Sequence, residues 1–254
     1  MNLSSILIAK NEEQNIEKCI KSLVNCIDEI NVFIDDLSDD RTFEIADKFN
    51  NVKLRKIKWQ GFSETKQEAL KFVTNDWVLW IDADEVLTEK LSEELTKFKD
   101  NIPLHSVYSV PRKAFFLGKW IKHCGWYPDR VNRLFNKNEI KFSQSSVHEF
   151  LHYKGQTGKL KNDLLHFTDP DIFHYFEKFN LYTSLAAEEL NKKKRAFKIS
   201  DILLRPAFTF FKMFIIKKGF LDGIQGFILC VFSSAYVFTK YCKLWELNKK
   251  GIQI

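Results

Sequence analysis

Short apolar runs alternate with amphipathic stretches through the first half of the chain. Four runs have the continuous hydrophobicity of buried strands, at 3–9, 30–34, 52–57 and 77–81. Between them, apolar residues recur at three- and four-residue steps over 16–23, 41–49 and 64–73, as on one face of a helix. Strands that alternate with helices predict an α/β fold with a mostly parallel sheet and right-handed crossovers.

Polar and acidic side chains follow three of these strands directly: Asn11 and Glu13, then Asp35, then Asp82 and Asp84. The carboxyl ends of parallel strands meet at one edge of a sheet, where ligands bind in open α/β folds, so we expect these residues to converge. Convergence of like charges is unfavourable unless a cation or a hydrogen-bonding ligand offsets it. Asp82 and Asp84 are therefore candidate ligands of a divalent cation that also holds a diphosphate.

The same residues have simpler interpretations. Asp82 and Asp84 begin a solvated loop before the next helix, Asp35 is a helix cap before Arg41, and Lys66 is a solvated helix charge. No glycine-rich phosphate loop of the Rossmann or Walker type occurs, so a diphosphate would not be held in that way.

The last third of the chain is helical in pattern, apolar and basic. One apolar stripe runs from Phe173 to Leu185 and another from Ile224 to Trp245. From Asp171 onward there are 14 Lys and Arg against 7 Asp and Glu, whereas the whole chain has a net charge of +6. The uncharged run from Gly223 to Thr239 is at the lower limit for a membrane span. We predict helices that lie in the interface of an anionic membrane, and no nucleic-acid partner.

The alternative for these helices is packing on the rest of the protein or in a dimer seam, which leaves a homo-oligomer open. The five cysteines are odd in number and lack the paired spacing of a zinc site, so we expect reduced thiols. Residues 1–10 have no basic leader and too short an apolar run for an export signal. We therefore expect a cytoplasmic protein.

An ordered set of short motifs narrows the prediction. It comprises Ile8–Glu13, Phe33–Asp35, Gly61 with Lys66, Asp76–Glu85, Gly125–Asp129, Arg133–Phe135, Val147–Glu149, Gly219–Gly223 and Lys240–Glu246. Together these motifs resemble the family 2 glycosyltransferases, which have the GT-A fold, and within them the lipopolysaccharide core biosynthesis glucosyltransferase-like group. One difference is that Asp36-Leu37-Ser38 stands where the family has a small residue and then Gly-Ser.

The resemblance implies a GT-A catalytic domain over 1–170 and a helical, amphipathic membrane-association and acceptor region over 171–254. It implies a UDP-sugar donor, with Asp35 accepting a hydrogen bond from the uracil ring. Lys66 would face the diphosphate, Asp82 would contact the ribose or the metal, and Asp84 would bind Mg²⁺ or Mn²⁺. The other residues implied near the donor are Ala9, Asn11 and Glu13, with Arg130 and Arg133 on phosphate.

The resemblance also implies inversion at the anomeric carbon, which requires a general base near the acceptor. Glu149 is our first candidate for that base and Asp129 the second, each of which is alternatively an ion-pair partner. Trp126, Tyr127 and His148 are the expected acceptor residues, although core packing explains the aromatic pair equally well.

The sequence thus predicts a metal-dependent inverting glycosyltransferase. We expect it to move glucose from a UDP-sugar to a lipid-linked glycan, namely the inner-core heptose of lipopolysaccharide. We expect it to lie peripherally on the inner face of the bacterial inner membrane. The alternatives are a nucleotidyltransferase, which would be expected to carry a glycine-rich signature near its first strand, and a non-catalytic nucleotide-sugar-binding membrane module.

Overall fold

The computed structural model describes residues 1–142 and 151–250. The chain divides into two compact units. The first unit comprises Met1–Arg112 and Asp129–His166, and the second comprises Lys113–Pro128 and Phe167–Ile254. The second unit therefore includes a segment from the middle of the chain, which the helical pattern after residue 171 did not indicate.

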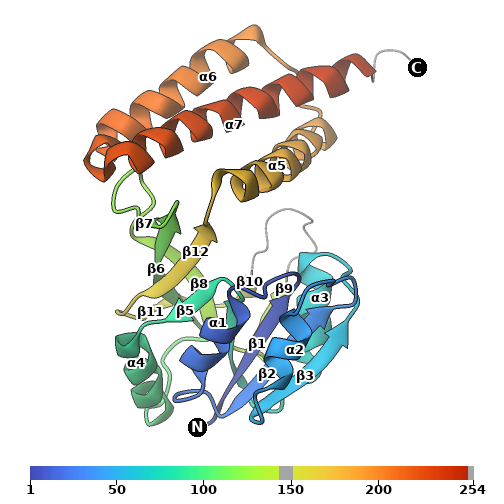
Figure 1. Ribbon diagram of the computed structural model, residues 1–254, viewed down its shortest axis with the longest axis vertical. Helices are drawn as coiled ribbons and strands as arrows, with labels where there is room; N and C mark the ends of the chain where they lie inside the picture. The colour runs from blue at the N-terminus through green and yellow to red at the C-terminus, as the bar shows by residue number, and fades with distance from the viewer. Residues whose placement is uncertain (143–150, 251–254) are drawn as a thin grey trace. The chain divides into compact units, whose positions relative to one another are not determined.

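Four parallel strands form the first half of the main sheet (Figure 1). They are β1 (Leu3–Ala9), β2 (Glu29–Asp35), β3 (Val52–Ile57) and β4 (Trp77–Asp82), in the spatial order β3-β2-β1-β4. Every residue of β2 is buried, because helices cover both faces of the sheet. The predicted α/β fold with parallel strands is confirmed.

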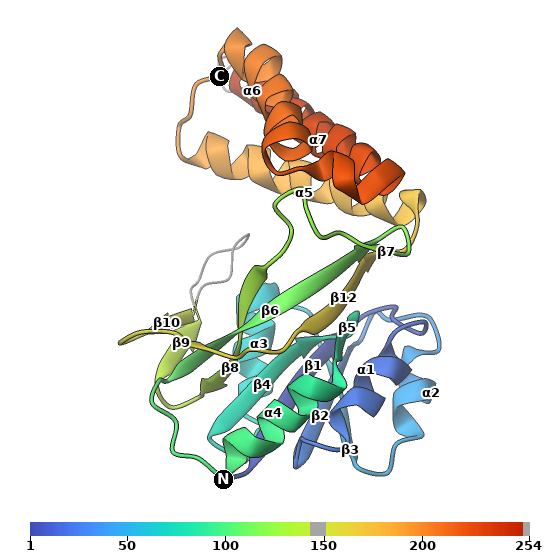
Figure 2. The ribbon, with the colours of Figure 1, turned by 90° about the vertical axis from the view of Figure 1, so that its left-hand side faces the viewer.

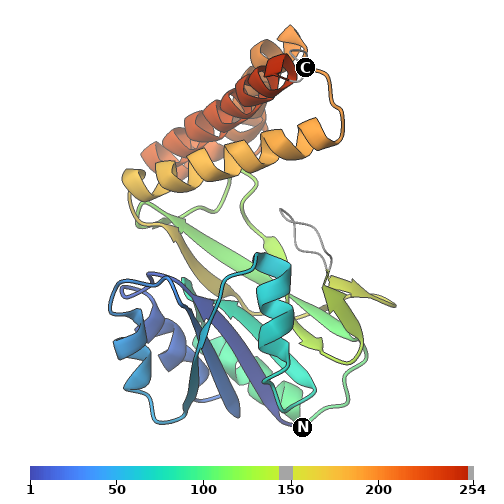
Figure 3. The ribbon, with the colours of Figure 1, turned by 90° about the vertical axis from the view of Figure 1, so that its right-hand side faces the viewer.

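Helices α1 (Ile16–Leu23), α2 (Thr42–Asp47) and α4 (Glu89–Lys99) cover one face, and α3 (Phe62–Leu70) covers the other (Figures 1, 2 and 3). The apolar positions of α1 recur at helical spacing and are all buried against the sheet. Thr88 precedes α4, and its hydroxyl caps the helix by accepting a hydrogen bond from the Leu91 N–H group.

The other half of the sheet contains antiparallel pairs, which the hydrophobic pattern did not indicate. Beyond β4 the order continues with β8 (Asp129–Asn136), β6 (Val107–Phe116), β12 (Leu164–Asp169) and β5 (Glu85–Leu87). Strand β8 is antiparallel to β4 and β6, and β12 is antiparallel to β5. Short strands β7 (Lys119–Trp120) and β11 (Gly158–Lys159) pair with β6, and β9 (Ile140–Phe142) pairs separately with β10 (Leu151–Tyr153).

The second unit is built around three helices, α5 (Ile172–Lys192), α6 (Ile199–Phe211) and α7 (Gly223–Lys250). A turn of π and 3₁₀ helix, η1 (Lys212–Ile216) and η2 (Gly219–Asp222), connects α6 to α7. Helix α7 packs on both α5 and α6, which Figures 1 and 2 show. Leu229, Cys230 and Leu244 of α7 are fully buried in this packing.

The segment Gly219–Lys249 is long and apolar enough to cross a membrane, with a mean hydropathy of 1.5 over its most apolar stretch. Only 22% of that stretch is buried within the protein. It is the one such helix in the described parts of the chain. A core helix of a soluble protein is normally mostly buried, so the exposed apolar surface of α7 requires a different explanation.

Candidate active site

The parallel strands bring the predicted acidic residues to one edge of the sheet. Strand β1 lies between β2 and β4, with Ile8 opposite Phe33 on one side and Asp82 on the other. Asp35 and Asp82 therefore leave the sheet at the same edge, separated by the width of one strand, roughly 10 Å.

On the β2 side, two loops are joined by hydrogen bonds from polar side chains. The Asn11 Oδ1 atom accepts hydrogen bonds from the Ser38 hydroxyl and from the Asp39 N–H group, both at 3.0 Å. Glu13 Oε2 lies 3.1 Å from Arg41 Nε, and the Glu13 N–H group donates to Asp40. Ala9, at the end of β1, is buried in the hydrophobic core. The loops therefore form one connected rim.

Asp35 itself shapes the turn that follows it. Its Oδ1 atom accepts a hydrogen bond from the Leu37 N–H group at 3.1 Å, and its Oδ2 atom lies 3.4 Å from Lys10 Nζ. A carboxylate that bonds to the backbone two residues on makes an Asx turn, which needs no glycine. The turn therefore closes with Leu37 in place, and the leucine side chain is 71% exposed.

On the β4 side, Asp82 is held by two neighbours. Its Oδ1 atom accepts a hydrogen bond from the Trp80 indole at 3.0 Å, and its Oδ2 atom forms an ion pair with Arg133. Burial raises the pKa of the Asp82 carboxyl, but the charges of Arg133 and Lys66 outweigh burial and hold that pKa well below its usual range. Asp82 is therefore ionised and fixed in orientation.

Arg133 joins Asp82 to a second, fully buried acid. The Arg133 guanidinium lies 2.6 Å from Glu85 Oε1, and the other Glu85 oxygen accepts the Asp82 N–H group at 3.1 Å. Burial raises the pKa of the Glu85 carboxyl, although the positive charge of Arg133 acts in the opposite direction. Burial alone would lower the pKa of the Arg133 guanidinium, but the negative charges of Asp82 and Glu85 outweigh burial and raise it. Arg133 thus bonds two carboxylates through one guanidinium nitrogen, and its predicted contact with phosphate stays a prediction.

Arg112 extends this network to Asp129. Its NH1 atom lies 3.5 Å from Glu85 Oε1, and its Nε atom donates to Asp129 Oδ2 at 3.0 Å. Asp129 is thus an ion-pair partner of Arg112 rather than of Arg130 or Arg133. The Arg130 guanidinium donates to the backbone carbonyls of Ser109 and Leu160, and its predicted contact with phosphate stays a prediction.

Lys66 is buried on α3, and its ammonium group lies 2.8 Å from the centroid of the Trp80 ring. This contact is a cation–π interaction, which is stronger where water is excluded. The solvated-charge interpretation of Lys66 is therefore wrong, since its charge is inside the site and acts on Asp82.

Asp84 has a partner that the sequence pattern did not indicate. Its Oδ2 atom lies 3.2 Å from Nε2 of His166, and both side chains are 15% exposed. His166 is on β12, paired in register with Glu85 of β5. The other imidazole nitrogen, Nδ1, is buried without a hydrogen-bond partner. No local sequence signal marks His166, because only the pairing of β12 with β5 brings it here.

A carboxylate oxygen and an imidazole nitrogen are both ligands of divalent cations, so this pair fits such an ion. Among residues 1–142 and 151–250, no group of three or more His, Cys, Asp or Glu forms a complete metal site. A cation held by Asp84 and His166 would therefore need further ligands from a substrate or water. That arrangement is typical of Mg²⁺ bound with phosphates.

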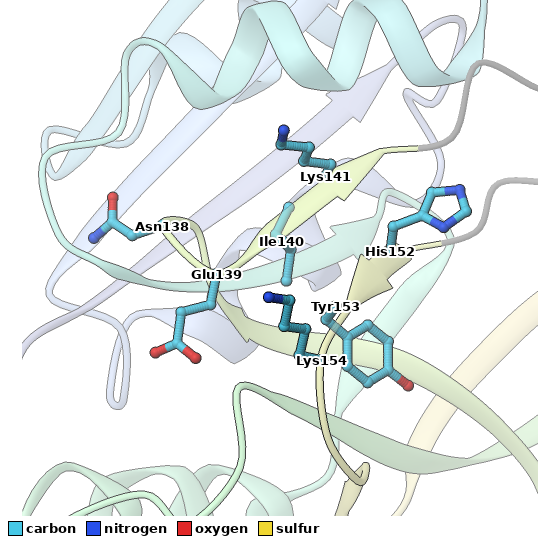
Figure 4. A pocket seen from close by; sticks show the side chains of 7 residues that line it. All are labelled: Asn138, Glu139, Ile140, Lys141, His152, Tyr153 and Lys154. Atoms are coloured by element: carbon cyan, nitrogen blue, oxygen red, sulfur yellow. The ribbon is translucent and has the colours of Figure 1, made fainter.

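The remaining predicted residues are not part of this cluster. Trp126 and Tyr127 belong to the second unit, where the Tyr127 ring packs edge-to-face on Trp120. His148 and Glu149 lie outside the described residues. A cavity of about 470 Å³ at the β9–β10 hairpin is lined by Lys141, His152 and Tyr153, among others, but by none of the predicted residues within the described ranges (Figure 4).

Comparison with known proteins decides the family. The model of glycosyl transferase family 2 matches residues 4–155, which is more than half of the chain. The chain belongs to glycosyl transferase family 2. The matched range of this glycosyltransferase contains Asp35, Asp82 and Asp84, and ends before His166 and the helices of the second unit. Membership of this family makes the protein a glycosyltransferase and not a nucleotidyltransferase.

Two curated relatives match this glycosyltransferase over nearly its whole length. An uncharacterized glycosyltransferase of Rickettsia typhi is 28% identical, over 98% of this chain and 88% of its own. The lipopolysaccharide core biosynthesis glycosyltransferase LpsC of Rhizobium meliloti is also 28% identical, over 96% of this chain and 92% of its own. This similarity confirms the predicted resemblance to the lipopolysaccharide core group.

Among solved structures, a mannosyltransferase from Pyrobaculum calidifontis, in complex with GDP-mannose and Mn²⁺, has a TM-score of 0.57. It is 12% identical, and the match covers 96% of this chain and 87% of that one. At this identity the similarity concerns the fold, and it supports the predicted GT-A architecture.

Proposed function

We propose that this glycosyltransferase moves a hexose, glucose in the first instance, from a UDP-sugar to a lipid-linked glycan of the lipopolysaccharide core. The observation that carries the proposal is the Asp84–His166 pair beside the ionised Asp82, at the carboxyl edge of a parallel sheet. The similarity to LpsC, a lipopolysaccharide core biosynthesis glycosyltransferase, supports the core glycan. Within that glycan we propose an inner-core heptose as the acceptor.

In this proposal the rim on the β2 side binds the nucleoside. Asp35 accepts a hydrogen bond from the uracil ring, and the connected loops that contain Asn11 and Glu13 border the base and ribose. The buried residue Ala9 lies at the base of this proposed nucleoside site. Asp82 faces the ribose: its side chain is 42% exposed, while Trp80 and Arg133 fix its orientation.

Asp84 and His166 would hold Mg²⁺ or Mn²⁺ together with the diphosphate of the donor. Such an ion supplies Lewis-acid stabilisation of the charge that develops on the departing nucleoside diphosphate. Lys66 contributes a further positive charge beside Asp82. The network of Arg133, Glu85 and Arg112 orients the acids, and Arg133 and Arg130 remain candidates for a contact with phosphate.

The acceptor hydroxyl must lose its proton as it attacks the anomeric carbon with inversion. We retain Glu149 as the general base and His148 as its neighbour at the acceptor. Asp129 is the second candidate, although Arg112 binds its Oδ2 atom. Trp126 and Tyr127 offer flat amphipathic faces for the acceptor sugar.

A lipid-linked acceptor requires the enzyme to reach a membrane. The turn between α6 and α7 exposes apolar side chains next to lysines: Ile215, Ile216, Phe220 and Leu221, with Lys212, Lys217 and Lys218. Exposed apolar groups bordered by basic residues suit an anionic bilayer surface. We therefore place the protein peripherally on the cytoplasmic face of the inner membrane, with the region after residue 171 as its contact.

A donor screen with purified lipid acceptors tests the proposal. The wild type should transfer sugar from a UDP-sugar only when Mg²⁺ or Mn²⁺ is present. Asp84→Ala should abolish transfer while the circular dichroism spectrum is unchanged, and Asp100→Ala is the matched control because Asp100 is an exposed acid at the end of α4. Transfer by Asp84→Ala at the wild-type rate, or undiminished transfer in chelator, would refute the metal-dependent proposal.

A further inference from the structure

The turn between α6 and α7 contains a buried acid, Asp222, that the proposed reaction does not use. Asp222 is 2% exposed. Its Oδ2 atom accepts a hydrogen bond from the His123 N–H group at 2.8 Å, and its Oδ1 atom accepts one from the Lys122 N–H group at 3.3 Å. The Oδ1 atom also lies 3.0 Å from Nδ1 of the His123 ring. One carboxylate therefore binds two consecutive residues of the loop that follows β7.

Backbone contacts reinforce this attachment within the second unit. The Lys119 ammonium group donates to the Asp222 carbonyl at 2.7 Å, and the Cys124 N–H group donates to the Lys217 carbonyl at 3.0 Å. The turn is thus bonded to β7 and to the first half of the loop, up to Cys124. Figure 1 shows the two segments side by side.

The close approach of loop and turn depends on small residues. A Cβ atom added at Gly219 would lie 2.8 Å from Cys124 Sγ and 2.9 Å from Cys230 Sγ. A Cβ atom added at Gly226 would lie 2.2 Å from the Gly219 carbonyl oxygen. Distances this short exclude any larger residue, so the turn and the first part of α7 form a close-fitting seat for the loop.

The loop needs this external support because of its own backbone. Cys124 has a φ of 57° and Gly125 a φ of 82°, which are left-handed conformations. For a residue other than glycine this costs about 1–2 kcal/mol. A loop of this kind is retained where surrounding contacts determine it. The residues that follow directly are Trp126 and Tyr127.

We propose that Asp222 is a positioning residue for the acceptor, which acts by fixing the loop that carries Trp126 and Tyr127. This inference rests on the proposed function, in which those two aromatic residues bind the acceptor sugar. The same turn exposes Ile216 and Leu221, which belong to the proposed membrane contact. Asp222 thereby joins the acceptor loop to the element that meets the lipid surface.

The first test uses Asp222→Asn in the full chain. Asparagine has one accepting oxygen, and its NH₂ group replaces the other carboxylate oxygen, which accepted a hydrogen bond from the loop. At least one hydrogen bond to the loop is therefore lost. We expect faster hydrogen exchange at the amides of Lys122 and His123. We also expect the acceptor KM to rise by about ten- to a hundredfold, because the misplaced aromatic residues bind the acceptor. The donor KM should stay within about twofold, because these residues do not bind the donor.

Asp201→Asn is the matched control. Asp201 is 1% exposed and lies in the same unit, but its carboxylate binds Arg195 and Arg205 instead of the loop. This variant should leave loop exchange and the acceptor KM unchanged. Binding to vesicles that contain phosphatidylglycerol should be unchanged in both variants, since neither alters an exposed side chain.

A second pair of variants approaches the contact from the loop, where His123 is 32% exposed and tolerates substitution more easily. His123→Ala should raise the acceptor KM, and His123→Asn should restore it, because the asparagine NH₂ group replaces the Nδ1 donor. This rescue would show that the hydrogen bond to Asp222, and not the imidazole ring itself, is what positions the loop.

The possible failures are distinguishable. Unchanged amide exchange in Asp222→Asn would show that Asp222 does not hold the loop. Faster exchange with an unchanged acceptor KM would show that the loop does not position the acceptor. If the wild type transfers no sugar, the proposed function fails together with the acceptor role, while exchange still reports whether Asp222 holds the loop.

Discussion

Asp84 Oδ2 lies 3.2 Å from Nε2 of His166, although the two residues belong to different stretches of the first unit, Met1–Arg112 and Asp129–His166. The pairing of β12 with β5 creates this contact, since His166 is opposite Glu85 in the register. In the proposed function the pair would supply one oxygen and one nitrogen ligand to a cation, and the remaining ligands would come from the donor diphosphate and water. Such a site would not need a complete cluster of protein ligands.

Replacement of His166 should weaken the binding of the cation without disturbing the fold. We expect His166→Gln to raise the Mn²⁺ concentration for half-maximal transfer by about tenfold or more, since even residues that only support a metal ligand matter by about 10–100-fold. A metal titration of transfer, with Mn²⁺ binding followed by electron paramagnetic resonance, measures this. His105→Gln is the control, because His105 instead contacts the Tyr108 ring. Equal metal dependence of His166→Gln and wild type would remove His166 from the site.

Arg133 should be the most sensitive residue of the buried network. Arg133→Met leaves Asp82 and the fully buried Glu85 without their main counter-charge, which we expect to cost about 3–5 kcal/mol of unfolding free energy. Adding Glu85→Gln should recover part of that loss, because the uncompensated buried charge is then gone. Urea unfolding of the single and double variants measures both effects, and a single variant as stable as wild type would contradict the prediction.

The two candidate bases can be separated by isosteric amides. We expect Glu149→Gln to lower kcat by about 10²–10⁴-fold with donor binding retained, as for the loss of a general base. Asp129→Asn should lower kcat far less, because Asp129 is occupied by Arg112. Single-turnover kinetics with calorimetry of UDP binding provide the measurement. The reverse pattern would make Asp129 the base.

Glu29 should contribute stability that depends on pH. Burial raises its pKa, but hydrogen bonds from Lys53, Ser4 and Thr74 lower it to about 2, against an ordinary value of 4.5. Because the folded pKa is the lower one, the stabilisation is complete above pH 4.5 and is lost as the pH falls toward 2.

Glu29→Gln should therefore be less stable than wild type by about 1–3 kcal/mol at pH 7, and the difference should shrink on acidification from pH 4.5. Thermal or urea unfolding at several pH values measures the difference. If the difference in stability between the variant and wild type were the same at pH 7 and pH 3, protonation of Glu29 would not be coupled to unfolding.

The turn between α6 and α7 should control membrane binding. Ile215→Glu with Ile216→Glu places two charges on exposed apolar positions and should reduce binding to anionic vesicles by about tenfold or more. Ile102→Glu with Leu104→Glu is the control, since these side chains are equally apolar and even more exposed in the first unit. Co-sedimentation measures binding. Retention of the first variant on vesicles after a carbonate wash would indicate instead that α7 crosses the bilayer.

The sequence alone determined the elements whose signals are local. Continuous apolar runs and helical spacing predicted the four parallel strands and the helices between them. The acidic residues after β2 and β4 then had to emerge at one edge, because side chains that follow parallel strands share a direction. The ordered motifs were sufficient for the family, which the match over residues 4–155 confirmed.

Only the tertiary structure decided what those acids contact. His166 meets Asp84, and Arg133 binds Asp82 and Glu85, through antiparallel strands whose partners are distant in sequence. The spacing of apolar residues likewise could not predict the hydrogen bond between His123 and Asp222. Local spacing reports which face of an element is buried, whereas ion pairs and ligand sets depend on which elements become neighbours, and that choice is made by the packing of the whole chain.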